Sequence, residues 1–323
     1  MKLFRRLLST VWMIALIACL SAQTYPSRAV KIVIPYPPGQ GIDILLRIIG
    51  DKVAVGLGQP FVVENKAGAS GTIGTYFVTQ QAPDGYTLLG GSSGAMSISP
   101  VLTPEIVQYD TLKDFEPISG ISTVAQVFVV PANSPYKTLQ DLIKAAKQKP
   151  GQLNFASSGK GSTQHLFVEH FAGMTGIKLQ HIPYKGAAPA LTALLGGQVD
   201  FMSETTSAII GQIQAGTVRP LAVTSPARSE FLPDVPTVAE SGVSGYEAVG
   251  WITMLAPAGT PSAIADKLYA EIQKVMADPE IRKKMIEMGQ MPMTTPRNKM
   301  KNFYSTEIEK WRKVIADAKL LAQ

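Results

Sequence analysis

The sequence predicts an α/β protein with two lobes, built on parallel sheets that carry helices on both faces. Short β-branched runs, such as residues 30–35, alternate with segments whose apolar residues recur at helical spacing. Strands and helices that alternate in this way are typical of parallel sheets. The alternation begins again at residue 127, and a chain of 323 residues has the length of about two domains.

The apolar pattern places the elements in chain order. The first half has expected strands at 30–35, 61–64 and 87–89, with helices after residue 41 and at 72–81. The second half has expected strands at 127–130, 153–156, 181–184, 199–202 and 221–224, with helices at 138–149, 163–173 and 188–195. Residues 262–321 are nearly all helical by pattern, and two X-Pro pairs divide them into three helices.

The first two dozen residues have the layout of a secretory signal peptide. A cationic start is followed by an apolar run over residues 7–20, and by the small residues Ser21 and Ala22. This run is shorter than the ~20 apolar residues of a membrane-spanning helix. We therefore expect residues 1–22 to be removed and the body of the protein to be periplasmic. Residues 16–19 also resemble a lipobox, in which Cys19 would be lipidated and retained; cleavage after Ser21 or Ala22 is the favoured interpretation.

Composition excludes several classes of protein. Cys19 is the single cysteine, so the exported body has no disulfide and depends on a large apolar core. Three units of the net charge of +6 come from leader cations, which leaves +3 on the rest. These charges are spread along the chain without a basic stripe, which argues against nucleic-acid binding.

Three glycine- and serine-rich loops each follow a predicted strand and precede a predicted helix. They are residues 36–41 (YPPGQG), 90–94 (GGSSG) and 157–162 (SSGKGS). Such loops lie beyond the carboxyl ends of parallel strands, where α/β proteins bind ligands. Glycine permits close approach of the backbone, helix N-termini attract anions, and serine adds neutral donors. Together the loops predict a carboxylate held largely by neutral groups.

Other functions are disfavoured by the same residues. Residues 90–94 match a GxSxG nucleophile elbow, but nothing marks His165, His170 or His181 as the base of a triad. Lys160 lies in a P-loop-like run but is followed by glycine rather than Ser or Thr, which argues against a nucleotide site. The histidine spacing does not suit a metal, and no cofactor is expected.

Eight segments resemble the solute receptors of tripartite tricarboxylate transporters, the Bug or TctC-like binding proteins. They include YPSRAVKIVIPYPPGQGID, APDGYTLLGGSSGAMSISPVL, KPGQLNFASSGKGSTQH and HIPYKGAAPALTALLGGQVD, and they cover essentially the whole exported chain. The resemblance implies a two-lobed type II periplasmic binding protein (Venus flytrap) fold with no enzymatic activity. With crossings near 118–125 and 248–255, lobe 1 would comprise residues 23–122 and 248–323, and lobe 2 residues 123–247.

The resemblance also implies the ligand and the partners. The ligand would be a small organic acid, an amino acid or an aromatic carboxylate, and the partners the membrane components of the transporter. A sensor kinase is an alternative partner, and we expect a monomer. The residues that would bind ligand are Tyr36, Pro38, Gly39, Gln40, Gly41, Ser92, Ser93, Ser157, Ser158, Gly159, Ser162, Thr163, Tyr184, Lys185, Gly186 and Glu204.

Two departures from the family pattern bear on the ligand. Gln40 stands where the family commonly has glycine, so it would reach the ligand or narrow the mouth. Ser203 and Glu204 replace an apolar or aromatic residue and an Asp. Glu204 would disfavour a second carboxylate and favour an amine or a polar neutral group. Alternatively, Ser203 or Glu204 caps the helix expected at 206–214. Asp43 is expected to complement its helix dipole rather than touch ligand.

Overall fold

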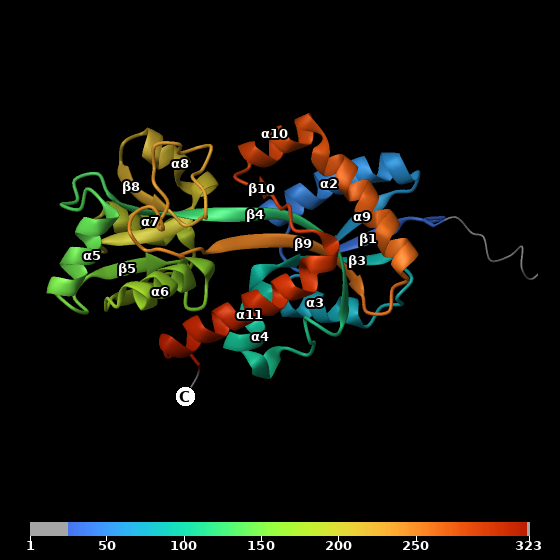
Figure 1. Ribbon diagram of the computed structural model, residues 1–323, viewed down its shortest axis with the longest axis horizontal. Coiled ribbons are helices and arrows are strands. Elements are labelled where there is room, and N and C mark those ends of the chain that lie inside the picture. Colours follow the sequence, from blue (N-terminus) through green and yellow to red (C-terminus); the bar gives the residue numbers. More distant parts are fainter. Residues whose placement is uncertain (1–24, 322–323) are drawn as a thin grey trace, which may run out of the picture.

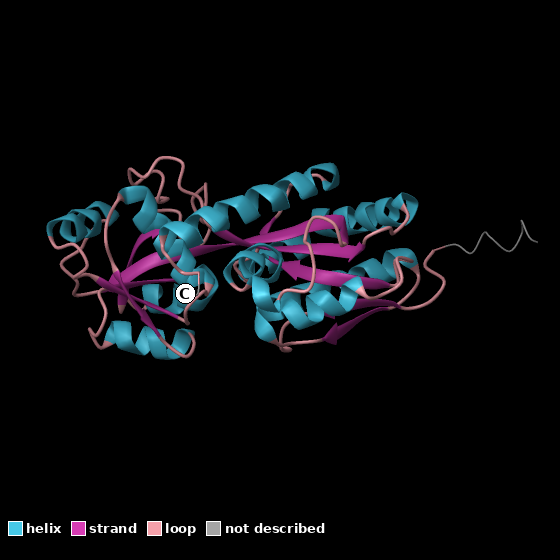
Figure 2. Ribbon diagram, turned by 90° about the horizontal axis from the view of Figure 1, so that it is seen from below, coloured by secondary structure: helices cyan, strands magenta, loops and turns pink. Residues whose placement is uncertain are grey.

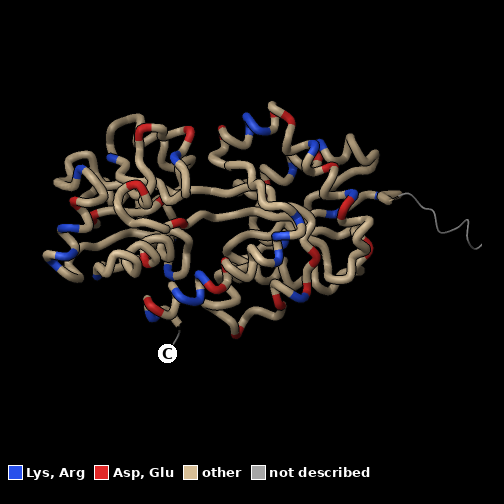
Figure 3. Tube along the Cα trace, viewed as in Figure 1, with Lys and Arg blue, Asp and Glu red and all other residues tan. Residues whose placement is uncertain are grey.

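The computed structural model describes residues 25–321 and shows two α/β lobes joined by two long strands (Figure 1). The leader, including Cys19, lies outside the described residues. Within residues 25–321 no helix has the length and apolar character needed to cross a membrane. Figure 3 shows lysines, arginines and acidic residues spread over both lobes rather than gathered in one stripe.

The first lobe contains a parallel three-stranded unit. Strand β1 pairs with β2 on one side, with Val30 opposite Phe61, and with β3 on the other. Helices α2 and α3 connect these strands. The elements are β1 (Val30–Ile34), α2 (Gly41–Leu57), β2 (Phe61–Asn65), η1 (Ala69–Gly71), α3 (Thr72–Thr79), β3 (Thr87–Ser92), η2 (Gly94–Ile98), α4 (Ser99–Leu102) and η3 (Pro104–Ile106).

The second lobe repeats this arrangement around β5, with β6 and β7 parallel to it on either side. Helices lie on both faces of each sheet (Figure 2). The elements are α5 (Leu139–Gln148), β5 (Asn154–Ser157), α6 (Thr163–Thr175), β6 (Gln180–Pro183), α7 (Ala187–Leu195), β7 (Phe201–Thr205), α8 (Thr206–Gln214) and β8 (Val218–Val223).

Strand β4 (Phe115–Pro131) passes from one lobe to the other. Its residues up to Ala125 pair with β9 (Val249–Pro257) in the first lobe. From Gln126 onward it pairs instead with β7 and β8 in the second lobe. The chain therefore crosses in both expected regions, and the two-lobed fold is confirmed. The lobe boundaries at residues 122/123 and 247/248 stay a prediction.

One strand differs from its predicted position in a way that matters for the site. The apolar pattern placed a strand at 199–202, whereas β7 runs over Phe201–Thr205. The strand continues through Ser203 and Glu204, which are both buried. Polar residues in a buried strand break the apolar pattern, so the sequence alone placed its end too early.

The C-terminal helices were expected on the first lobe, and α9 (Ser262–Ala277) and α10 (Pro279–Glu287) pack there. Helix α11 (Met300–Asp317) instead spans both lobes (Figure 1). Near its start Tyr304 packs against Trp251 of β9. Near its end Trp311 stacks on Phe167 of α6, with ring centroids 5.5 Å apart and planes within 7°. Remaining short elements are η4 (Arg297–Lys299) and β10 (Met291–Pro292), which pairs with β4.

Candidate functional site

A cleft of about 640 Å³ lies where loops from the two lobes face each other. The first lobe contributes the loop after β1, Ser70 of η1 and the segment from η2 to the end of α4. The second lobe contributes the glycine-rich loop after β5 and the first turn of α6. The lining residues are Tyr36, Gln40, Ser70, Gly94, Ile98, Ser99, Leu102, Thr103, Ser158, Gly159, Lys160, Gly161, Ser162, Thr163 and Gln164. Among these, Lys160 has the one formally charged side chain, so the walls suit an anion held mainly by neutral donors.

The loop after β1 is held by the buried carboxylate of Asp43. The Gly39 N–H donates to Asp43 Oδ2 at 2.9 Å, and Arg47 Nε and Asn65 Nδ2 donate to Oδ1 at 3.1 and 2.9 Å. Asn65 also donates to the carbonyl of Tyr36 at 3.0 Å. Burial raises the pKa of Asp43, but the hydrogen bonds outweigh it and leave the pKa below its usual value. Asp43 therefore positions the loop from behind and does not line the cleft.

Tyr36 joins the loops that form the first-lobe wall. Its hydroxyl lies 2.7 Å from Ser92 Oγ and donates to the carbonyl of Ser70 at 3.3 Å. Gly71 packs beneath the ring: a Cβ there would lie 3.0 Å from the Tyr36 hydroxyl, and its φ of +94° favours glycine. Burial raises the pKa of Tyr36, so the hydroxyl keeps its proton.

The loop after β5 is braced by two stacked histidines. The N–H of Gly161 donates to His165 Nδ1 at 3.0 Å, and Ser162 caps α6 by accepting from the His165 N–H at 3.3 Å. The His165 ring stacks on the His181 ring, with centroids 3.7 Å apart. His181 Nε2 lies 2.6 Å from Ser157 Oγ. Burial, His165 and Lys160 lower the pKa of His181 to about 3, so His181 is neutral at pH 7.

Amides and hydroxyls form a connected network at the second-lobe wall. Ser158 Oγ and Thr163 Oγ1 donate to Gln164 Oε1 at 3.0 and 3.3 Å. Thr163 Oγ1 also accepts from Gln126 Nε2 at 3.0 Å, and Ser203 Oγ donates to Gln126 Oε1 at 2.6 Å. Ser203 therefore turns into the wall, and its hydroxyl is used within the protein.

Glu204 lies behind Gln164 with 5% of its surface exposed. Its carboxylate accepts from Gln164 Nε2 at 3.4 and 3.5 Å and from the Thr205 N–H at 2.7 Å. Burial raises the pKa of Glu204, although the bonds from Thr205 and Gln164 oppose this. Helix α8 has Thr205 at its N-cap and no side-chain cap, so the capping interpretation of Ser203 and Glu204 is wrong.

The family pattern described as the tripartite tricarboxylate transporter family receptor (TctC) matches residues 45–320. The chain belongs to this receptor family. Protein BugT of Bordetella pertussis is 36% identical over 301 residues, which cover 93% of this chain and 92% of BugT. The chain is thus a periplasmic-type solute-binding receptor and not an enzyme.

Two solved receptors from Rhodopseudomonas palustris have the same fold. Rpa4515, solved with adipate, has a TM-score of 0.77 and 35% identity, covering 91% of this chain and 98% of its own. MatC, solved with malate, has a TM-score of 0.73 and 28% identity, and the match covers 90% of this chain and 100% of MatC. Both ligands are small dicarboxylates.

The structure gathers part of the predicted set on the cleft walls: Tyr36, Gln40, Ser158, Gly159, Ser162 and Thr163. The other predicted residues lie behind or beside these walls. Ser93 and Ser157 are buried, Ser92 is bonded to Tyr36, and Glu204 is one residue removed from the cleft through Gln164. Those at the exposed rim of the first loop are Pro38, Gly39 and Gly41.

The predicted fourth wall of the receptor acts as a brace. The Tyr184 N–H donates to the carbonyl of Ser157 at 3.0 Å, and the Gly186 N–H to that of Ser158 at 3.3 Å. Lys185 is exposed, and none of the three lines the cleft. Their backbone holds the third loop in place, so they support the site without forming its surface.

Sequence reasoning missed several lining residues. Ile98, Ser99, Leu102 and Thr103 come from the η2–α4 segment, and Leu102 reaches the second lobe, where a Cβ on Gly161 would lie 2.4 Å from its Cδ2. Gln164 and Ser70 were also missed. In the sequence, only the glycine at position 161, within the predicted 157–162 loop, indicated that another side chain could approach the backbone closely there.

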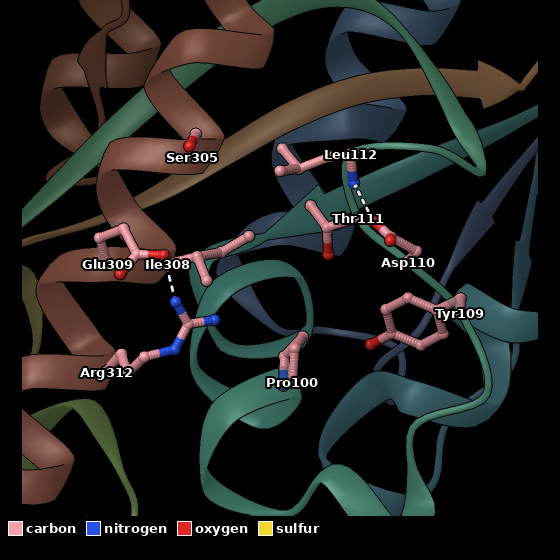
Figure 4. Close-up of a pocket in the computed structure, with 9 residues that line it drawn as sticks. All are labelled: Pro100, Tyr109, Asp110, Thr111, Leu112, Ser305, Ile308, Glu309 and Arg312. Carbon is pink, nitrogen blue, oxygen red and sulfur yellow. Dashed lines mark hydrogen bonds and ion pairs between the residues drawn. The ribbon is translucent and has the colours of Figure 1, made fainter.

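A second cavity, of about 270 Å³, lies apart from these loops, between α11 and the segments around Pro100 and Tyr109 (Figure 4). Arg312 points toward Glu309 along the same helix, and Asp110 caps its own turn by accepting from the Leu112 N–H at 2.9 Å. Arg312 and Asp110 thus have partners within their own segments. We therefore take the interlobe cleft, and not this cavity, as the candidate ligand site.

Proposed function

We propose that this receptor captures a small carboxylated metabolite in the periplasm and delivers it to the membrane components of a tripartite tricarboxylate transporter. The observation that carries the proposal is the composition of the cleft: hydroxyl-bearing and glycine residues from both lobes line a space with a single charged side chain, Lys160. Such donors bind an anion without the cost of burying a fixed counter-charge. Adipate and malate, bound by two relatives, are likewise small carboxylates.

A second polar group of the ligand would be sensed by Glu204, from behind the second-lobe wall. Glu204 is buried behind Gln164 and carries a carboxylate that would repel a second ligand carboxylate. The proposed ligand therefore has one carboxylate near the Ser158 loop and an amine or neutral polar group toward Glu204. Export follows from the leader, with residues 1–22 removed and Cys19 lost with them.

A thermal-shift panel tests the proposal. A ligand at 100-fold its dissociation constant stabilises the folded receptor by about 2.7 kcal/mol, which raises the melting temperature measurably. The panel contains acetate, benzoate, adipate, malate, aspartate and glutamate, with the matching primary amides as controls. We expect stabilisation by at least one acid and none by its amide. Silence across the panel would remove the proposal.

Delivery to a transporter has its own test. Deleting the gene in the native bacterium should abolish uptake of the radiolabelled acid that the panel identifies, and the wild-type gene should restore it. Unchanged uptake in the deletion strain would leave a binding protein without a transport role.

A further inference from the structure

Gln164 lies in the first turn of α6 and points its amide at the groups that the proposed ligand would use. Its oxygen accepts from Ser158 Oγ at 3.0 Å and from Thr163 Oγ1 at 3.3 Å. Its nitrogen donates to both oxygens of Glu204, at 3.4 and 3.5 Å. The amide thus lies between two hydroxyl donors on one side and a buried carboxylate on the other.

The direction of these bonds follows from the groups around them. The Glu204 side chain accepts from the Thr205 N–H and faces the NH₂ of Gln164, which leaves the amide oxygen of Gln164 toward the hydroxyls. Thr163 Oγ1 accepts from Gln126 Nε2, whose own oxygen accepts from Ser203. The single proton of Thr163 is then free for Gln164, and that of Ser158 is used in the same way.

We infer that Gln164 is an internal substitute for the ligand's carboxylate, which occupies the hydroxyl donors of the empty receptor and is displaced on binding. This inference rests on the proposed function, since it concerns the same cleft. The amide is neutral, and a carboxylate makes charge-assisted hydrogen bonds roughly twice as strong to the same hydroxyls. A carboxylate therefore displaces the amide, and the bonds it breaks lower the affinity of the receptor.

Replacing Gln164 with methionine tests the inference directly. Methionine has similar length and flexibility but no strong hydrogen-bond acceptor. The hydroxyls of Ser158 and Thr163 would then have no acceptor at position 164 and would be free to donate to the ligand. Calorimetric titration with the tightest acid of the panel should give a dissociation constant roughly tenfold lower than for wild type, the scale expected for one net hydrogen bond. Gln198→Met, at an exposed glutamine outside the cleft, is the matched control and should leave binding unchanged.

Combining Gln164→Met with Ser158→Ala shows whether a gain in affinity comes from the loss of a competing acceptor or from a wider cleft. In Ser158→Ala one of the two contested donors is gone, so Gln164→Met should improve binding by a much smaller factor there. A gain that persists in full with Ser158→Ala would mean that steric room, not competition, explains it. Gln164→Ala, verified as folded by its circular dichroism spectrum, is the second variant if the methionine protein is unstable.

Two results would overturn the inference while leaving the proposed function intact. Weaker binding by Gln164→Met would show that the amide holds ligand, and equal binding would show that it does not compete. If neither the wild-type nor the variant protein binds any acid of the panel, the proposed function fails, and the inference fails with it.

Discussion

The hydroxyl of Tyr36 lies 2.7 Å from Ser92 Oγ, and this bond joins the first loop of the site to the strand that carries the second. The bond engages the oxygen of Ser92, which does not line the cleft, whereas Tyr36 does.

Tyr36→Phe should remove this bond and weaken binding of the panel acid. We expect a loss of stability of about 1 kcal/mol, typical of one hydrogen bond, and a few-fold rise in dissociation constant. Ser92→Ala removes the same bond, whereas Tyr36→Phe also loses the longer bond to the Ser70 carbonyl, so the double variant should be little worse than Tyr36→Phe alone. Urea unfolding of the three variants checks this, and strictly additive losses would contradict it.

Asp43→Asn should disorder the first loop, because an amide cannot accept from Gly39, Arg47 and Asn65 as the carboxylate does. Hydrogen bonds to charged groups are worth more than neutral ones, and a loss of roughly 2 kcal/mol in unfolding free energy is expected. The pKa of Asp43 lies below its usual value, so its contribution is present above the unfolded-state pKa and is lost as the pH falls through the folded-state value. The acid sensitivity of unfolding should accordingly be smaller in Asp43→Asn than in wild type.

Glu204→Gln should change which ligands bind. The substitution removes a buried negative charge while keeping a side chain that can still bond Gln164, so ligands with a second carboxylate should gain affinity. We expect the affinity for adipate to rise about tenfold and that for aspartate to rise less. Titration calorimetry at pH 7 measures the dissociation constants of both acids for wild type and Glu204→Gln. Unchanged affinity for adipate would show that Glu204 does not interact with the second carboxylate of the ligand.

The sequence was informative about this site where glycine and serine define loops and uninformative where packing decides. Residues 157–162 lie on the cleft wall or directly behind it, because a glycine-rich turn between a strand and a helix has few alternatives; that they bind ligand stays a prediction. Ser92 and Ser93 looked equivalent to them, but β3 runs on through Ser92 and the chain then enters a π-helical turn, which turns both away. Gln164 and Leu102 carry no local signal, since their roles depend on how the lobes and β7 pack.

The pH dependence of stability should come partly from His170, which stacks on Tyr246 at 5.1 Å. Burial, Lys310 and Lys313 lower its pKa to about 4, so the folded protein binds fewer protons there than the unfolded chain between about pH 6.5 and 4. Its neutral form thus favours folding above pH 6.5, and this contribution is lost as the pH falls toward 4. His170→Phe keeps the stacking and should flatten this part of the profile in urea unfolding; an unchanged slope would contradict the assignment.

Trp311 should anchor the end of α11 to the second lobe through shape rather than hydrogen bonding. Its ring is fully buried on Phe167, and its indole N–H finds no hydrogen-bond partner among the described residues. Trp311→Phe keeps a stacked ring and loses no hydrogen bond, so it should cost about 1 kcal/mol, whereas Trp311→Ala should cost about 3 to 5 kcal/mol through the cavity it leaves.

Hydrogen exchange distinguishes local anchoring from general destabilisation. In Trp311→Ala the amides of residues 311–317 should exchange faster than those near Tyr304, because the first turns of α11 keep their packing on Trp251 in the first lobe. Thr306→Ala, at an exposed position of the same helix, is the matched control and should leave exchange unchanged. Uniform acceleration along the whole helix would mean that α11 is released as one unit, and that Trp311 holds it to both lobes together.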